Sequence, residues 1–420
     1  MAKCVNRCRK AFLAIFLAAA VAFAPASAQE VFMPNQLDAV PSVLIIGTAK
    51  GGTTDLYKQL TDEDVNNAPG RPDPPFPLNA IKEPSMLNRG GIEGKLVPMQ
   101  PLYFEYLQLL NHPCSRVGPD EFNECLASRG SSELTLDASP DYSYDFLAPF
   151  YLKQLSPLSK IVMMIREPVE RAEVLYRHYK LTQWLYPGAA SRTCAPALYH
   201  SFDLPLPLAN RTAWGLSNAQ GKWLDKGIDV LARGFLEAVQ GDREALATLQ
   251  RALNCPPADV ACQADNWRDI STQPLMQPME HRLFMGGLYR YMMAMWRRVY
   301  FQPGRVMLID SQAYYERRYP VMEKVIRYLY GRPMLKEERE IAASGLVWRK
   351  AGVPPLSGVK LSKDVGQQLA EFYNQHVMQG FFRMLTDMSA EGAWVAGFDS
   401  EPWDQCPGFA EFNRDRTRRH

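Results

Sequence analysis

The chain has 420 residues, of which 47% are apolar and 22% are charged, and eight are cysteines. This composition excludes a collagen-like fibre and a scaffold held together by disulfides alone. Only one segment has a long unbroken apolar run, which excludes a protein that spans a membrane many times. The formal net charge of +2 gives no support for nucleic-acid binding. Four of the 47 Lys and Arg residues lie within the first ten positions, and the remaining 43 face 45 acids.

The N-terminus has the composition of a secretory targeting segment. Basic residues up to Lys10 precede fourteen apolar residues, Ala11 to Ala24, and the small-residue sequence Ala26-Ser27-Ala28 follows. This order predicts a signal peptide over residues 1–28 that is cut after Ala28. An uncleaved signal anchor is the alternative, and it is the only way in which we expect the chain to contact a membrane. Either interpretation places the rest of the chain in the secretory pathway or outside the cell.

Six cysteines follow the targeting segment, an even number that fits an oxidising compartment. Short sequence separations favour two disulfides, and the third follows by elimination: Cys114–Cys125, Cys255–Cys262 and Cys194–Cys406. No CxxC pair occurs and the histidines are scattered, so we expect no metal site. One glycosylation sequon, Asn210-Arg211-Thr212, fits a lumenal surface loop.

Compact apolar runs predict four buried strands, at residues 42–47, 134–137, 161–165 and 306–310. Patterns of helical period predict helices from Asp55 onward and over residues 101–110, 146–155, 168–184, 280–300, 319–330 and 361–388. Short strands that alternate with helices are typical of a mostly parallel sheet with helices on both faces. The sequence therefore predicts an α/β fold of three layers.

One large domain is expected over residues 41–400, after a linker at residues 29–40. Five prolines in residues 68–78 predict a loop. Residues 187–275 do not follow the alternation of strands and helices seen in the rest of the chain, and they contain helical patterns, cysteines and the sequon. They are therefore interpreted as a helical, disulfide-containing insertion. Residues 401–420 are expected to form a C-terminal tail.

The loop after the first predicted strand has the composition of an anion-binding site. It reads Gly47-Thr-Ala-Lys-Gly-Gly-Thr-Thr54. Glycines let backbone amides approach an anion, and the following helix presents the positive end of its dipole to the same anion. Lys50 adds a charge, and Thr53 and Thr54 add hydroxyl donors. The alternative is a plain strand-to-helix turn, which would need neither the lysine nor the threonines.

A P-loop nucleotide kinase is a second candidate for this pattern. Gly47 and Gly52 have the separation of the two motif glycines in GxxxxGK[ST], and Asp310 ends a predicted strand as a Walker B acid would. However, Thr53 occupies the lysine position of that motif, and Lys50 lies three residues too early. The loop therefore differs from that of a kinase.

These motifs resemble those of carbohydrate sulfotransferases that use 3′-phosphoadenylyl sulfate (PAPS). The loop around Lys50 resembles the family's 5′-phosphosulfate loop. Ile161-Val-Met-Met-Ile-Arg-Glu-Pro-Val-Glu-Arg171 resembles its 3′-phosphate segment, and Lys82-Glu83-Pro84 is similar to its Lys-Glu-Pro. Asp137-Ala-Ser-Pro-Asp-Tyr142 occupies the place of Glu-Lys-Ser-Pro-x-Tyr. The resemblance extends over about residues 41–390 by the order of the motifs, and it is greatest to Golgi enzymes that act on glycosaminoglycans.

The resemblance implies a Golgi or secreted O-sulfotransferase with a P-loop-like fold, which moves a sulfuryl group from PAPS to a hydroxyl of a polysaccharide. It implies no metal and no nucleic-acid partner, and it says nothing of the oligomeric state. Glu83 would act as the general base, with Lys82 and Asp137 also in the catalytic site, and Lys50 would offset charge on the leaving phosphate oxygen. A solvated loop acid and a turn cap are the alternatives for Glu83 and Asp137.

The cofactor-binding residues that the resemblance implies are Lys50, Gly51, Gly52, Thr53, Thr54, Arg166, Val174, Arg349 and Lys350. Two of the chain's residues depart from the family pattern, since Val174 replaces a serine and Ala138 replaces a lysine. Either a phosphate donor is lost at Val174, or a neighbour such as Arg171 or Tyr176 replaces it. A glycan-binding protein without catalytic activity on the same fold is therefore the third candidate. Arg349 and Lys350 correspond to a basic loop over the nucleotide, and two charges on a solvated turn are the alternative.

Overall fold

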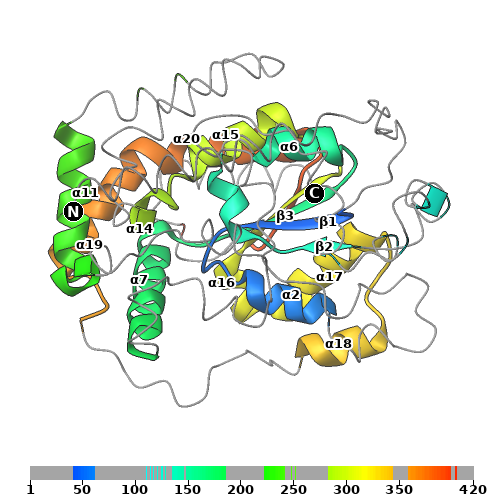
Figure 1. The fold of residues 1–420 in the computed structure, drawn as a ribbon, viewed down its shortest axis with the longest axis horizontal. Coiled ribbons are helices and arrows are strands. Elements are labelled where there is room, and N and C mark those ends of the chain that lie inside the picture. The colour runs from blue at the N-terminus through cyan, green and yellow to red at the C-terminus, as the bar shows by residue number, and fades with distance from the viewer. Residues whose placement is uncertain are drawn as a thin grey trace, which may run out of the picture.

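A computed structural model of the chain describes residues 41–61, 135–145, 148–185, 222–241, 282–343 and 358–398 (Figure 1). It also describes single positions between 110 and 128, positions 247 and 251, and Trp403. The predicted targeting segment, linker, Pro-rich loop, helix over 101–109 and sequon lie outside the described residues, as does most of the predicted insertion.

Five parallel strands form one sheet in the order β2-β1-β3-β4-β5. Their bounds are Val43–Gly47 for β1, Leu136–Asp137 for β2, Lys160–Ile165 for β3, Val306–Asp310 for β4 and Trp394–Ala396 for β5. Every residue of β1 and β4 is buried, because helices cover both faces of the sheet, and such strands are marked by continuous apolar runs. The four predicted strands are confirmed, although the second is only two residues long.

The fifth strand is not predicted from the sequence. It has three residues, too few for a periodic pattern, and it lies between Gly392 and Gly397. These glycines have φ values of 101° and 85°, which place both turns in the left-handed region that favours glycine. Trp394 pairs with Met307, so β5 extends the sheet beyond β4.

Helices form a layer on each face of the sheet (Figure 1). One layer contains α2 (Thr53–Thr61), α16 (Ser311–Glu316), α17 (Arg318–Tyr330) and α18 (Lys336–Ala343). The other contains α6 (Ala148–Leu155), α7 (Pro168–Leu185), α11 (Ile228–Gly241), α14 (Arg282–Met285), α15 (Tyr289–Val299), α19 (Lys363–Tyr373) and α20 (Gln379–Ala390). A separate apolar core fills the space on each side of the sheet. The predicted three-layer α/β fold is confirmed.

The helices differ from the predicted ones in three places. The predicted helix over 280–300 is divided into α14 and α15 at Gly286 and Gly287. The backbone at Gly287 packs closely on Tyr373, since a Cβ there would lie 2.8 Å from the tyrosine ring. The predicted helix over 361–388 contains a π-helical turn, Asn374–Met378, between α19 and α20. Two short helices, α16 and α18, are not predicted, because six and eight residues show too little periodicity.

One helix of the predicted insertion and one residue of the predicted C-terminal tail contribute to the main core. Helix α11 falls within the predicted insertion, yet the Phe235 ring lies 5.2 Å from that of Phe284 and 5.5 Å from that of Phe372, between centroids. Trp403 falls within the predicted tail, yet it is 1% exposed and its ring lies 5.7 Å from those of Phe382 and Phe398. These aromatic contacts join both segments to the core beside α19 and α20.

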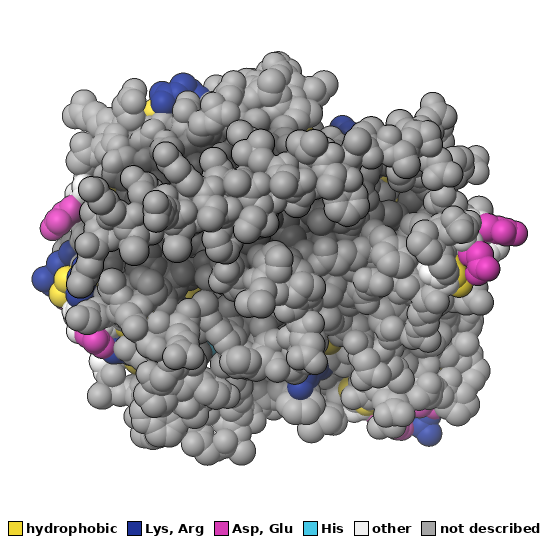
Figure 2. All heavy atoms as spheres, in the orientation of Figure 1, with side chains coloured by type: hydrophobic (Ala, Val, Ile, Leu, Met, Phe, Trp, Pro, Cys, Tyr) yellow, Lys and Arg dark blue, Asp and Glu magenta, His cyan; other side chains and the backbone are white. Residues whose placement is uncertain are grey.

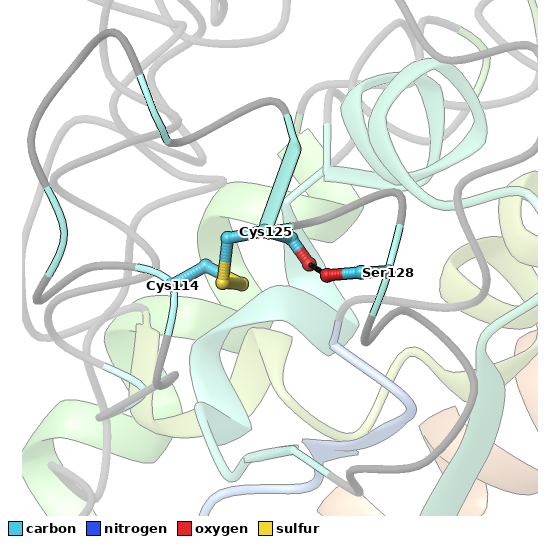
Figure 3. Close-up of a disulfide and its surroundings, with 3 residues drawn as sticks. All are labelled: Cys114, Cys125 and Ser128. Atoms are coloured by element: carbon cyan, nitrogen blue, oxygen red, sulfur yellow. Dashed lines mark hydrogen bonds between the residues drawn. A yellow bond between two sulfur atoms is a disulfide. The ribbon is translucent and has the colours of Figure 1, made fainter.

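A disulfide joins Cys114 and Cys125, with an S–S distance of 2.10 Å (Figure 3). The carbonyl of Cys125 accepts a hydrogen bond of 3.0 Å from the hydroxyl of Ser128. This pairing confirms the first predicted disulfide. The other two predicted disulfides lie outside the described residues. None of the described helices combines the length and apolar character needed to cross a bilayer.

Buried tyrosine hydroxyls predict that the fold loses stability at high pH. Burial raises the pKa of Tyr289 to about 12 and also raises the pKa values of Tyr300, Tyr314, Tyr328 and Tyr373. In the unfolded chain these groups ionise near pH ~10, so their contribution is fully present below that pH and is lost as the pH rises toward 12. Urea unfolding followed at pH 8 to 12 should show the midpoint falling above pH ~10. If every tyrosine of the folded protein gave a tyrosinate absorbance near pH 10, this prediction would be wrong.

Candidate anion-binding site

The order of the strands reverses direction between β1 and β3. The chain moves from β1 to β2 on one side and then to β3 on the other, so the connections diverge between β1 and β3. In open α/β sheets, ligands bind outside the carboxyl ends of the strands at such a point. The predicted phosphate loop follows β1 and Arg166 follows β3, so the topology brings the two together.

The loop between β1 and α2 folds against the end of β3. The amide and the hydroxyl of Thr48 both donate to the carbonyl of Met164, at 2.8 and 3.0 Å. Lys50 adopts a left-handed conformation with φ of 69°, and the amide of Gly51 donates to the carbonyl of Thr48 at 2.8 Å. These bonds hold the turn that carries Lys50 at the carboxyl edge of the sheet.

Glycine is required at both positions that precede α2. A Cβ on Gly51 would lie 2.7 Å from the carbonyl oxygen of Met164, and a Cβ on Gly52 would lie 2.9 Å from the hydroxyl of Tyr315. Helix α2 begins at Thr53. The first backbone hydrogen bonds of the helix are donated by the amides of Asp55 and Leu56, both to the carbonyl of Gly52. In the part of the chain that the structure describes, the amides of Thr53 and Thr54 donate to no backbone carbonyl. Such amides, together with the positive end of the helix dipole, suit an anion.

Arg166 links the two predicted anion-binding motifs. Its Nη1 donates to the carbonyl of Lys50 at 3.1 Å, and its Nη2 lies 2.6 Å from the carboxylate of Glu170. Burial lowers the pKa of the Arg166 guanidinium, but the hydrogen bond and charge of Glu170 outweigh this effect, so the pKa is raised. The carbonyl of Arg166 accepts a 2.6 Å hydrogen bond from the hydroxyl of Tyr289. A permanent positive charge is thus fixed beside the loop.

Three residues that the sequence analysis did not select as site residues support or adjoin the loop. The hydroxyl of Ser311 donates to the carbonyl of Gly51 at 2.6 Å, and the hydroxyl of Tyr289 orients the backbone of Arg166. Tyr315 places its hydroxyl next to Gly52. A usable signal existed for Ser311 and Tyr315, because they follow a predicted strand whose carboxyl end lies at the same edge of the sheet as the phosphate loop.

A buried ion pair anchors the first turn of α2. The carboxylate of Asp55 lies 2.9 Å from the guanidinium of Arg318 and accepts a 2.7 Å hydrogen bond from the hydroxyl of Tyr314. Both charged side chains are less than one tenth exposed, and the Arg318 guanidinium lies 5.2 Å from the centre of the Tyr314 ring. This network ties α2 to α16 and α17, so the start of α2 is held rigidly at the site.

Asp137 is fully buried at the end of β2. Its Oδ1 accepts a 2.6 Å hydrogen bond from the hydroxyl of Ser139, and its Oδ2 accepts one of 2.8 Å from the hydroxyl of Tyr142. These bonds stabilise the turn that leads into the 3₁₀-helix η3 (Pro140–Tyr144). These bonds to side-chain hydroxyls support a structural role of Asp137 in this turn, and its catalytic role stays a prediction.

The two neighbours named as alternatives for the hydroxyl missing at Val174 donate to backbone carbonyls elsewhere in the fold. Arg171 is fully buried and donates to the carbonyl of Leu283, and the hydroxyl of Tyr176 donates to the carbonyl of Leu224 at 2.8 Å. Both side chains are directed into the core around α14 and η4 (Lys222–Lys226). These bonds favour the other alternative, in which a phosphate donor is lost at Val174, and that alternative stays a prediction. Val174 itself lies on α7 and is half-buried.

The remaining predicted site residues are Lys82, Glu83, Arg349 and Lys350, and all four lie outside the described residues. Their roles stay predictions. Asp310, the acid that could have served a kinase, accepts a 2.9 Å hydrogen bond from the amide of Gln312 and caps α16. Among the described residues, no three His, Cys, Asp or Glu side chains cluster as a metal site would require.

No family model matches the chain, and no curated protein matches it. Among solved structures, a similar chain is a sulfotransferase from Alicyclobacillus acidocaldarius, with 15% sequence identity and a TM-score of 0.37. The alignment covers 82% of this chain and 95% of that chain. A likeness of this size carries no argument about function, which rests instead on the residues of the site.

Proposed function

We propose that this protein is a PAPS-dependent O-sulfotransferase that acts on a carbohydrate, a glycosaminoglycan-like polysaccharide. The observation that carries the proposal is the hydrogen bond from Arg166 to the carbonyl of Lys50. It brings together two motifs that are 116 residues apart in the sequence and that resemble the two phosphate-binding segments of these enzymes.

The described residues fit the two anionic ends of PAPS. The glycine cradle at Gly51 and Gly52, where a Cβ would collide with neighbouring atoms, allows a phosphate group close to the backbone. The first amides of α2 and the charge of Lys50 suit the 5′-phosphosulfate. Arg166 suits the 3′-phosphate, because a guanidinium binds phosphate oxygens through two parallel hydrogen bonds.

PAPS would supply the activated sulfuryl group, and the chain would supply position, charge and a base. In the transfer, the acceptor oxygen forms a bond to sulfur as the bond between sulfur and the phosphate oxygen breaks. Glu83 would accept the hydroxyl proton, and Lys50 would offset the charge that develops on the leaving phosphate oxygen. Most of the rate enhancement would come from groups fixed before the substrate binds, as in phosphoryl transfer. The buried pair of Asp55 and Arg318 supports this interpretation, because it holds the start of α2 in place.

The proposed location is the secretory pathway, either the Golgi lumen or outside the cell. The composition of residues 1–28 and the disulfide between Cys114 and Cys125 support this location, since disulfides persist in oxidising compartments. Sulfation of a polysaccharide fits the same compartment.

A thermal-shift experiment tests the proposed cofactor. Adenosine 3′,5′-bisphosphate, the product left after sulfuryl transfer, should raise the melting temperature, because a ligand that binds only the folded state stabilises it. ATP at the same concentration should give a smaller shift, since it has no 3′-phosphate for Arg166. A larger shift with ATP would instead support a nucleotide kinase.

Replacement of Tyr315 by phenylalanine should weaken binding of adenosine 3′,5′-bisphosphate about three- to tenfold, the worth of one neutral hydrogen bond. The Tyr315 hydroxyl lies beside Gly52 and is coupled electrostatically to Arg166. Burial and the charge of Asp55 raise its pKa, so it stays a hydrogen-bond donor. Isothermal titration calorimetry measures the effect. An unchanged affinity in Tyr315→Phe would show that this hydroxyl does not reach the nucleotide.

A further inference from the structure

On the face drawn in Figure 2, the described Lys and Arg side chains lie at separate places along the outline and form no single patch in this view. Three arginines do gather in a groove between α15 and α20. The groove has a volume of about 460 Å³, and Arg290, Arg297 and Arg298 line it. Its apolar part consists of Ala294, Phe301 and Met384. This volume is within the range of pockets that hold small organic ligands.

The groove lies away from the anion-binding site. Helices α15 and α20 belong to the layer across the sheet from α2 and α16 (Figure 1). Tyr289 is buried and bonds to Arg166, whereas Arg290 is turned roughly 100° around the helix and is half-buried. The arginines at positions 290, 297 and 298 recur at helical spacing, so they form one stripe on α15.

Among the residues that the structure describes, one of the three arginines is paired with acids and two are not. Arg297 forms ion pairs with Asp387 and Glu391, which fix it between α15 and the end of α20. Among the described residues, Arg290 and Arg298 form no ion pair. They are eight residues apart on α15, or about 12 Å along the helix axis. Within the described part of the chain, the groove thus offers two arginines without an ion pair, Arg290 near one end and Arg298 beside the paired Arg297 near the other.

The position of Arg290 is fixed by its surroundings. Its side chain lies across Gly380 of α20, where a Cβ would overlap it, and its guanidinium lies 5.8 Å from the centre of the Tyr291 ring. An arginine that is already held in place loses less conformational freedom when it binds a ligand. This arrangement favours a specific contact over a diffuse attraction.

We propose that the groove binds an anionic segment of a polysaccharide, at a site separate from the one where the hydroxyl reacts. The guanidinium groups of Arg290 and Arg298 would each pair with a sulfate or carboxylate group of the sugar chain. The apolar surfaces of Phe301 and Met384 would pack against the C–H face of a sugar ring. This inference rests on the proposed function only in its choice of a polysaccharide as the polyanion.

Binding of a chondroitin sulfate hexasaccharide, measured by calorimetry at low salt, tests the proposal. The double variant Arg290→Gln/Arg298→Gln should bind it about tenfold more weakly than the unaltered protein. Both should bind neutral dextran oligosaccharides negligibly. The thermal shift with adenosine 3′,5′-bisphosphate should be the same for both proteins, because neither arginine belongs to the nucleotide site. That shift reports on the proposed function separately from the groove.

A matched control removes two positive charges elsewhere. Arg233 on α11 and Arg327 on α17 are more than half exposed, and each pairs with an acid. The variant Arg233→Gln/Arg327→Gln should keep the affinity for the hexasaccharide within about twofold. An equal loss in both double variants would overturn the proposal, since it would show a general effect of net charge. A parallel tenfold loss of affinity for single-stranded DNA would overturn it too, because the groove would then accept any polyanion.

Discussion

Replacement of Glu83 by glutamine should lower turnover about 10²–10⁴-fold, the usual contribution of a positioned base. Glutamine keeps the size and hydrogen-bonding shape of the side chain but cannot accept the proton of the acceptor hydroxyl. Binding of adenosine 3′,5′-bisphosphate should barely change, because the base would face the acceptor and not the phosphates. Steady-state transfer rates and calorimetry on the same preparation measure both quantities.

The separation of turnover from binding distinguishes a base from a structural acid. A structural role for Glu83 would lower the melting temperature and the nucleotide affinity of Glu83→Gln together. Near-normal turnover in a well-folded variant would show that another group accepts the proton. Asp137, the other acid considered, is fully buried and accepts hydrogen bonds from Ser139 and Tyr142.

Replacement of Arg166 by alanine should weaken binding of adenosine 3′,5′-bisphosphate about ten- to a hundredfold, and Lys50→Ala should do the same for PAPS. Each change removes a charge-assisted contact worth about 1.5–3 kcal/mol. Arg166→Lys should give an intermediate loss, because lysine keeps the charge but not the two-pronged hydrogen bonding. Adenosine 5′-phosphosulfate, which lacks the 3′-phosphate, should lose little affinity in Arg166→Ala.

Arg327→Ala provides a matched control for Arg166→Ala. Arg327 pairs with Glu323 four residues away on a helix, just as Arg166 pairs with Glu170, but it lies on the exposed side of α17. Its replacement should leave nucleotide binding unchanged. If both nucleotides lost the same affinity in Arg166→Ala, the residue would act by holding the Lys50 loop and not by contacting the 3′-phosphate.

The parts of the fold that the sequence predicts are those with strong local signals. Residues 43–47 and 306–310 are continuous apolar runs because helices cover both faces of the sheet, and such runs are easily found. Strand β5 has three residues, and its place in the sheet depends on pairing with β4, which no local pattern reveals. At Gly287, where the predicted helix over 280–300 is divided, the backbone lies close to Pro168 and Tyr373, and no local pattern reveals these distant neighbours.

The anion-binding site is predictable only in part for the same reason. Two motifs are predictable because their residue types indicate an anion-binding site. They contain Lys50, Gly51, Gly52 and Arg166. Ser311 contacts the loop across 260 positions of sequence, and its place directly after a predicted strand is the one sequence signal for this contact. At Val174 the sequence does not reveal the directions of the neighbouring side chains. The sequence leaves two alternatives for the hydroxyl absent at Val174, and it cannot choose between them because the directions of Arg171 and Tyr176 are set by packing against α14 and η4.

Transfer of radiolabelled sulfate from PAPS to a panel of glycans measures the proposed activity itself. The panel should contain chondroitin, dermatan, heparan and a neutral glycan, with the protein expressed through the secretory pathway so that its disulfides form. We expect label in at least one acidic polysaccharide, and no label with Glu83→Gln beyond about one hundredth of that rate. Transfer of labelled phosphate from ATP, or binding of glycans by a protein that transfers no sulfate to any of them, would contradict the account.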